Sequence, residues 1–221
     1  MVLDKTGNVL EPRLTLRSKV ERLFSPVPKW VNWSYSFGGI AFLLFLLQLI
    51  SGIYLTFFYI PTAQDAWKSI SQIENTIFMG HFFRSLHRWS AFMLVIFVIA
   101  HAVRVFLFKA YREPRRGLWW IGEGLLILTL GFVITGYLLP WDVRAYWEVL
   151  SIRNSALNIP LLGQWINGYL LSSGLNDQIP VFRYFATHVV ILPLLICVGL
   201  ISHFALIRRL GVAPREGRKL K

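Results

Sequence analysis

Four long apolar stretches alternate with shorter polar segments along the chain. They cover residues 30–60, 82–108, 118–139 and 184–207, and each is close to or longer than the roughly 20 residues that an α-helix needs to cross a bilayer. The pattern predicts an all-α integral membrane protein with a bundle of four transmembrane helices. Segment 140–180 is rich in Pro, Gly, Asn and Ser, and we expect a long loop there that holds short surface helices.

The two ends of the chain are polar and basic. Residues 16–29 mix apolar and basic positions, which is typical of an amphipathic helix that lies along a membrane surface. The sequence therefore predicts three parts: a basic amphipathic surface segment at 1–29, a transmembrane domain at 30–210 and a basic tail at 211–221.

Composition and charge agree with a membrane protein. Hydrophobic residues make up 55% of the 221 residues, and the net charge of +12 comes from Lys and Arg that cluster before the first helix, at 109–116 and in the tail. By the positive-inside rule, both termini and the connection 109–116 face the cytoplasm. This distribution indicates membrane topology and no nucleic-acid partner. A single cysteine, Cys197, excludes an internal disulfide and a covalent Cys-x-x-Cys-His haem motif.

Four of the five histidines lie in the second and fourth predicted helices at similar spacing. His87 and His101 are 14 positions apart, and His188 and His203 are 15 apart. In an α-helix these separations are rises of roughly 21 and 22 Å with net rotations of about 40° and 60°, so each pair stays on one face. Because the two helices run in the same direction, depth pairs His87 with His188 on the outer side and His101 with His203 on the inner side.

Two such pairs predict two metal centres at different depths. Two axial histidines are the ligand set of a six-coordinate haem, which has no open position for oxygen or substrate. Electron transfer is the chemistry left to it. The sequence therefore predicts two stacked b-type haems with bis-histidine ligation, about 20 Å apart. His81 falls outside the pattern and is expected to be an ordinary histidine at the membrane interface.

Glycines and arginines supply candidate contacts for these haems. Gly38 and Gly52 are 14 positions apart, as are Gly122 and Gly136. Glycine at the depth of each haem would let a flat ring approach the backbone, although small residues also serve helix packing in membranes; the matching spacing favours haem clearance. Arginines near the predicted membrane edges would pair with haem propionates or extend to lipid headgroups: Arg84, Arg88, Arg104, Arg183 and Arg208.

Local motifs accompany the histidines. They are Arg-Ser-Leu-His-Arg-Trp-Ser-Ala at 84–91, His101 with Arg104, Thr-Gly-Tyr-Leu-Leu-Pro-Trp-Asp at 135–142, and Arg183 before His188 with Pro193 after it. Together they resemble the N-terminal half of cytochrome b from quinol-oxidising bc-type complexes, over residues from about 14 to 211. The unequal histidine spacing and the end of the chain after the fourth helix are similar to the split cytochrome b6 form.

This resemblance implies a subunit of a quinol oxidoreductase that is not catalytic alone. Electrons would pass from an outer quinol-oxidation site through a low-potential outer haem and a higher-potential inner haem to an inner quinone-reduction site, contributing to proton translocation. The implied partners are a separate C-terminal cytochrome b chain similar to subunit IV, a Rieske iron–sulfur protein and a c-type cytochrome, in a homodimeric complex. The Pro-Glu-Trp-Tyr motif of the outer site is missing from this sequence and would come from the separate chain.

The resemblance also assigns residues to the quinone sites. Trp141, Asp142 and Trp147 would form part of the outer pocket. Gln48 is a candidate at the inner site, although a Gln in the first helix could equally bond a neighbouring helix. One departure concerns Ser36, which stands before Phe-Gly-Gly where cytochrome b6 proteins carry a cysteine that anchors an extra haem. A covalent third haem is therefore not expected, and a bacterial cytoplasmic membrane is favoured over a plastid one.

Two alternative functions would also explain the paired histidines. A dihaem membrane anchor of a formate dehydrogenase or hydrogenase also has four or five helices and histidine ligands, but would lack the regular two-depth pattern. A transport protein whose histidines line a path would show no haem absorbance.

Overall fold

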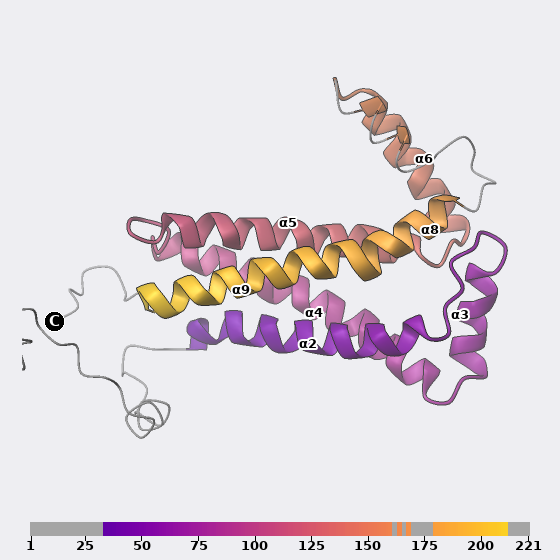
Figure 1. Cartoon of the computed structure of the whole chain (residues 1–221), viewed down its shortest axis with the longest axis horizontal. Coiled ribbons are helices and arrows are strands. Elements are labelled where there is room, and N and C mark those ends of the chain that lie inside the picture. The colour runs from indigo at the N-terminus through magenta and orange to yellow at the C-terminus, as the bar shows by residue number, and fades with distance from the viewer. Residues whose placement is uncertain (1–32, 161–162, 165–166, 169–178, 212–221) are drawn as a thin grey trace, which may run out of the picture. The chain divides into compact units, whose positions relative to one another are not determined.

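The computed structural model describes residues 33–160, 163–164, 167–168 and 179–211. The predicted surface segment at 1–29 and most of the tail lie outside them. Four helical spans are long and apolar enough to cross a membrane, as the sequence predicts: 33–56, 80–107, 116–138 and 180–210. The elements, shown in Figure 1, are η1 (Trp33–Ser36), α2 (Phe37–Thr56), α3 (Ala66–Asn75), α4 (Gly80–Leu107), α5 (Arg116–Leu138), α6 (Val143–Leu157), α8 (Ile179–Ala186), η2 (Thr187–Ile191) and α9 (Leu192–Leu210).

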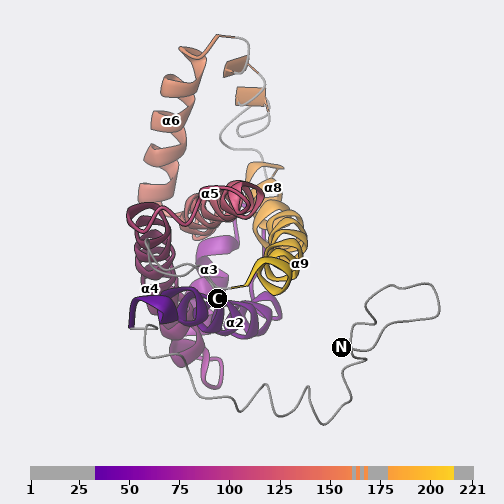
Figure 2. The same ribbon diagram turned by 90° about the vertical axis from the view of Figure 1, so that its left-hand side faces the viewer.

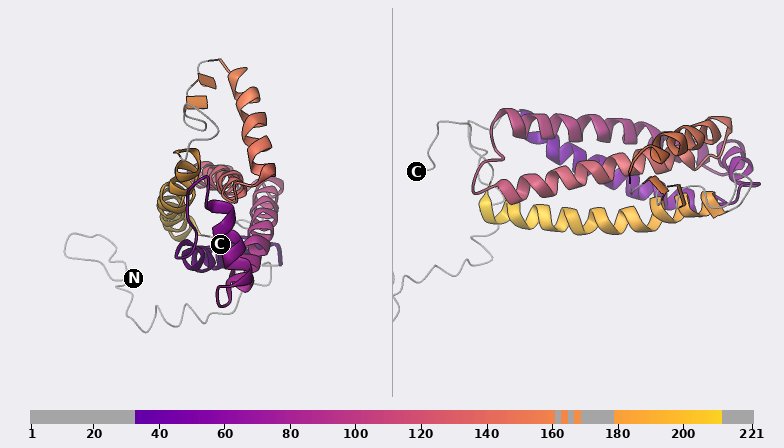
Figure 3. Two further views of the ribbon diagram at one scale, coloured as in Figure 1. Left: turned by 90° about the vertical axis from the view of Figure 1, so that its right-hand side faces the viewer. Right: turned by 90° about the horizontal axis from the view of Figure 1, so that it is seen from above.

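The four spans form two antiparallel helix pairs. α2 packs mainly against α4, and α5 packs mainly against α9. Gly38, near the start of α2, lies against His101, near the end of α4, whereas Gly52, near the end of α2, lies against His87. The view along the bundle in Figure 2 shows α2, α4, α5 and α9 arranged in a ring, and the right-hand view in Figure 3 shows them running alongside one another. Each pair is thus a helical hairpin that supplies histidines from its second helix.

The spans expose apolar side chains on most of their surface. Only 6–11% of the residues in each apolar window are buried inside the structure. Large aliphatic side chains on all four spans are more than half exposed, for example Leu43, Ile96, Ile127 and Ile201. Such helices are stable in lipid, where the surroundings are as apolar as the side chains. The structure therefore belongs in a membrane.

His188 lies in a π-helical segment, η2, between α8 and α9. Pro193 has no backbone N–H, and its ring would clash with the carbonyl four residues earlier in a regular α-helix. The N–H of Leu192 instead bonds the carbonyl of Thr187, five residues back. Such a π-turn takes up one extra residue inside an α-helix. The extra residue therefore accounts for the spacing of 15 between His188 and His203, compared with 14 in the other pair. It also reduces the rotation of about 60° that an uninterrupted α-helix would place between these two histidines.

The ends of the helix pairs nearest His87 and His188, which are predicted to be the outer ends, carry two short helices. α3 packs on α4, and a Cβ at Gly80 would lie 1.9 Å from the carbonyl oxygen of Ile73, so only glycine fits where α4 begins. α6 extends away from the end of α5 (Figure 1) and is one of the surface helices expected in segment 140–180. The buried face of α6 forms a cluster with Leu138 and Tyr184. This packing fixes the turn that follows α5.

Tyr59 joins the two hairpins at the same end. Its hydroxyl donates to the carbonyl of Leu139 at 2.5 Å, and its ring stacks on Phe185 with centroids 5.6 Å apart. Burial raises the pKa of the Tyr59 hydroxyl, so the hydroxyl keeps its proton for this bond. The contact links the segment after α2 to both α5 and α8.

Candidate metal centres between the helix pairs

His87 and His188 face each other between the two helix pairs. Their ring centroids are 6.3 Å apart and their planes are inclined by 64°. An imidazole nitrogen lies about 2 Å from a metal that it binds and the ring centre about 1 Å further, so rings on opposite sides of one metal have centres about 6 Å apart. The outer pair therefore has the separation that a shared metal requires.

A hydroxyl from the other helix of its hairpin holds each outer histidine. Ser51 Oγ lies 2.9 Å from His87 Nδ1, and Thr135 Oγ1 lies 2.9 Å from His188 Nδ1. Both hydroxyls donate their own proton to the carbonyl four residues earlier, at 2.6 and 2.8 Å, so we assign the imidazole Nδ1–H as the donor in each contact. The lone pair of Nε2 is then left for a metal, which is the usual arrangement of a histidine ligand.

The inner pair lacks these hydroxyls. The Nδ1 atoms of His101 and His203 are buried without a hydrogen-bond partner in the described part of the chain. The residues before the corresponding glycines are Phe37 and Ile121. Within the described residues, these unpartnered Nδ1 atoms distinguish the inner pair from the outer pair, whose Nδ1 atoms both contact a hydroxyl.

Each predicted glycine lies against one histidine of its own hairpin. A side chain at these positions would crowd the imidazole ring to different degrees. A Cβ added to the glycine would lie 2.8 Å from the nearest ring atom for Gly136 and His188, 3.0 Å for Gly38 and His101, 3.2 Å for Gly52 and His87, and 3.6 Å for Gly122 and His203. The flat ring that approaches the glycine backbone in this structure is thus the imidazole, and clearance for the haem itself stays a prediction.

Three of the five predicted propionate partners contact groups within the chain. Arg84 donates to Glu74 at 2.5 Å, and Arg183 donates to the carbonyl of Gly168 at 2.9 Å. The guanidinium of Arg104 is buried and lies 3.6 Å from the centre of the Tyr35 ring. The other two, Arg88 and Arg208, are exposed. A role toward propionates stays a prediction for all five.

Sequence reasoning missed the carboxylate that joins Arg84 to His81. One oxygen of Glu74 lies 2.7 Å from His81 Nδ1, and the other accepts from Arg84 at 2.5 Å. Partial burial alone would raise the pKa of Glu74, but the hydrogen bonds and charges of Arg84 and His81 lower it overall. The spacing of these residues in the sequence does not indicate the cluster, because they are brought together by the turn between α3 and α4.

The predicted quinol residues occupy the turn after α5 and the start of α6. Trp141 has a left-handed backbone, with φ of 49°, and its ring lies 6.1 Å from that of Tyr184. The Asp142 carboxylate caps α6 by accepting from the N–H of Ala145 at 2.9 Å. Trp147 is 63% exposed on α6. Trp141 and Asp142 thus shape the turn, while Trp147 is accessible to another molecule.

Gln48 lies at the level of the outer histidines. Its amide donates to the carbonyl of His87 at 2.7 Å and to Ser90 Oγ at 2.5 Å. These bonds join α2 to α4, which is the second of the two roles considered for this residue. Gln48 thus has a packing role beside His87 in this structure, and a role at a quinone site stays a prediction.

Comparison with known proteins identifies the family. The family model described as Cytochrome b/b6/petB matches residues 23–211. The chain belongs to the cytochrome b/b6 family. Cytochrome b6 of Euglena gracilis is 38% identical over 96% of this chain and 99% of its own length, and cytochrome b6 of Mastigocladus laminosus is 37% identical over 92% and 95%.

A solved structure described as a hyperthermophilic respiratory complex III shares the fold. The TM-score is 0.82 at 26% identity, over 95% of this chain and 56% of that one. The chain thus spans little more than half of that structure's chain. Membership of the cytochrome b/b6 family implies binding of b-type haem, and it favours the bc-type hypothesis over a dihaem anchor or a transport protein.

Proposed function

We propose that the chain is the transmembrane electron-transfer subunit of a bc-type quinol oxidoreductase. It would carry electrons from an outer quinol-oxidation site to an inner quinone-reduction site by way of two b haems, one between His87 and His188 and one between His101 and His203. The observation that supports it most is the outer pair, whose rings are 6.3 Å apart and whose Nδ1 atoms are both held by hydroxyls.

The chain's own residues fit this task. Ser51 and Thr135 orient the outer imidazoles and leave Nε2 free, while the four glycines let the ligand-bearing helices approach closely. When bound, a bis-histidine haem supplies one-electron transfer without an open coordination position. The rise of about 21 Å between the two levels of ligands covers more than half of a hydrocarbon core of about 30 Å.

Partners would complete the quinone sites. A separate chain similar to subunit IV would supply the remaining helices, as the likeness to cytochrome b6 proteins implies. A Rieske protein, a c-type cytochrome and a homodimeric assembly complete the proposal. Basic residues at 109–116 and in the tail support an orientation with both termini inside. Ser36, at the place of the cysteine expected in the photosynthetic form, supports a bacterial cytoplasmic membrane. The exposed face of α6 around Trp147 would meet the quinol or the partner chain.

The direct test is haem quantitation and a redox-titrated visible spectrum of the purified complex. The wild type should contain two b haems with separate midpoint potentials. Replacing His101 with Leu should remove the inner haem and leave the outer one, and replacing His87 with Leu should do the reverse.

His81→Gln is the matched control, because this histidine is exposed and outside the pairs. It should retain both haems. One haem or none in the wild type, or loss of haem in His81→Gln equal to that in the ligand variants, would refute the assignment of ligands.

A further inference from the structure

Glu123 is the only Asp or Glu within the four spans. It lies seven residues into α5, which places it about 10 Å from the inner end of the helix. Ionisable residues inside a membrane are costly and mark functional sites more often than packing positions. The proposed function gives Glu123 no role.

Among the residues that the structure describes, no hydrogen bond or ion pair reaches the Glu123 side chain. Arg104, the buried cation at the same end of the bundle, lies instead over the Tyr35 ring. A charge left in apolar surroundings needs a counter-charge from outside the chain.

The neighbours of Glu123 place it beside the inner histidines. The preceding residue, Gly122, lies against His203. One turn earlier on the same face of α5, the Trp119 ring packs 6.4 Å from Phe106 of α4, so this face is turned toward α4. Since α4 and α5 are antiparallel, Glu123 is level with the part of α4 next to His101.

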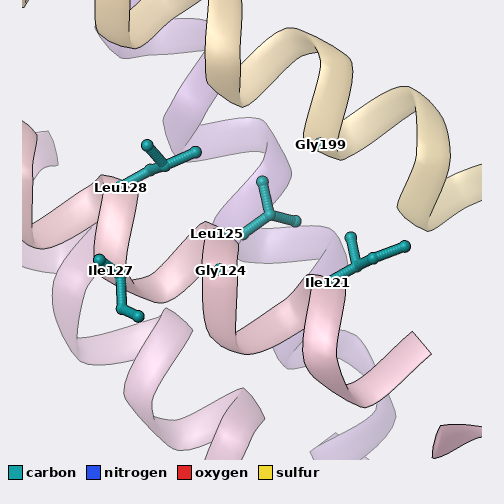
Figure 4. A pocket seen from close by; sticks show the side chains of 6 residues that line it. All are labelled: Ile121, Gly124, Leu125, Ile127, Leu128 and Gly199. Carbon is teal, nitrogen blue, oxygen red and sulfur yellow. The ribbon is translucent and has the colours of Figure 1, made fainter. Parts of the chain in front are cut away.

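The side of α5 that packs against α9 is a different environment. Figure 4 shows an apolar groove between α5 and α9 that is lined by Ile121, Gly124, Leu125, Ile127, Leu128 and Gly199. Glu123 is thus not one of the groove residues, although Ile127, one turn further along α5, is one of them.

We propose that Glu123 is the counter-charge of the inner haem and lowers its midpoint potential. The inference rests on the proposed function, because it requires a b haem between His101 and His203. A negative charge favours the oxidised, more positively charged form of that group over the reduced form. Unit charges about 10 Å apart at an effective dielectric constant of about 20 change an equilibrium constant roughly tenfold.

The test is a redox titration of the whole complex with Glu123→Gln, which removes the charge and keeps the size. The inner haem, identified as the component lost in His101→Leu, should become roughly ten times easier to reduce, a rise of about 59 mV for a one-electron couple. The outer haem should shift far less. Glu123→Asp should stay near the wild type, and Glu148→Gln, on exposed α6, is the matched control.

Each outcome decides between the two proposals. An unchanged inner midpoint in Glu123→Gln, an equal shift of both haems, or an equal shift in Glu123→Asp would overturn the role of Glu123. Glu123→Met provides a second neutral variant, suited to an apolar helix, if the Gln variant binds fewer than two haems. Absence of the inner haem from the wild-type complex would instead overturn the proposed function.

Discussion

Thr135→Val tests the hydroxyl that holds His188. Valine keeps the shape of threonine but removes the acceptor 2.9 Å from His188 Nδ1, so a buried N–H loses its partner. Leaving a buried donor unsatisfied costs about 1–3 kcal/mol. Loss of a hydrogen-bond partner of a metal ligand weakens metal binding about 10–100-fold. These ranges agree, since tenfold corresponds to about 1.4 kcal/mol. We expect the outer haem to bind at least tenfold more weakly.

The assay is the rate at which each haem leaves the purified complex for a haem-binding acceptor protein, followed in the visible spectrum. The outer haem should leave at least tenfold faster in Thr135→Val, and the inner haem should leave at the wild-type rate.

Thr129→Val is the matched control on the same helix. Thr129 is also buried, and among the described residues its hydroxyl bonds only the carbonyl of Leu125, at 2.8 Å. Equal haem loss in the two variants, or a wild-type rate in Thr135→Val, would refute the role of the hydroxyl.

Three further predictions concern the glycines, the π-turn and the acidic cluster. Gly136→Ala should displace His188 and cost about 1–3 kcal/mol of overpacking, whereas Gly122→Ala, with 3.6 Å of clearance, should retain its haem; haem content of the two variants distinguishes them. Pro193→Ala restores an N–H and allows a regular α-helix, which would turn His188 by about 100° relative to the rest of α9, so spectra should show loss of the outer haem alone. Because the pKa of Glu74 is lowered, its pairing stabilises the protein above a pH of about 4.3 and is lost as the pH falls through the lowered value; thermal melts should show this acid loss in the wild type and not in Glu74→Gln.

The spans and the histidine pairs could be predicted because both depend on local regularities. Length and hydropathy suffice for a helix in lipid, and the positions of His87 and His101 follow from the constant rise of one α-helix. A regular helix would also give an excess rotation between His188 and His203, which the π-turn reduces. Pro193 was visible in the sequence, but its effect on the hydrogen bonds around it emerges only in the folded backbone.

Contacts between elements were beyond the sequence. Arg84 was predicted to face a propionate, and the structure shows that Glu74 reaches it from α3 across a turn. Gln48 could serve either of two roles, and only the packing of α2 against α4 places its amide on the carbonyl of His87. The spacing of the glycines was informative, yet it could not tell whether an imidazole or a haem approaches them, since both would lie at the same depth.

The division into two hairpins has a consequence for biogenesis. Each hairpin supplies one histidine to each level, so neither hairpin alone can complete a site. A bound haem would therefore hold together two hairpins that are synthesised one after the other. Its insertion would be the step that fixes their final arrangement. In haem-starved cells a protease should consequently cut the connection 108–115 more readily, because no bound haem would hold the two hairpins together.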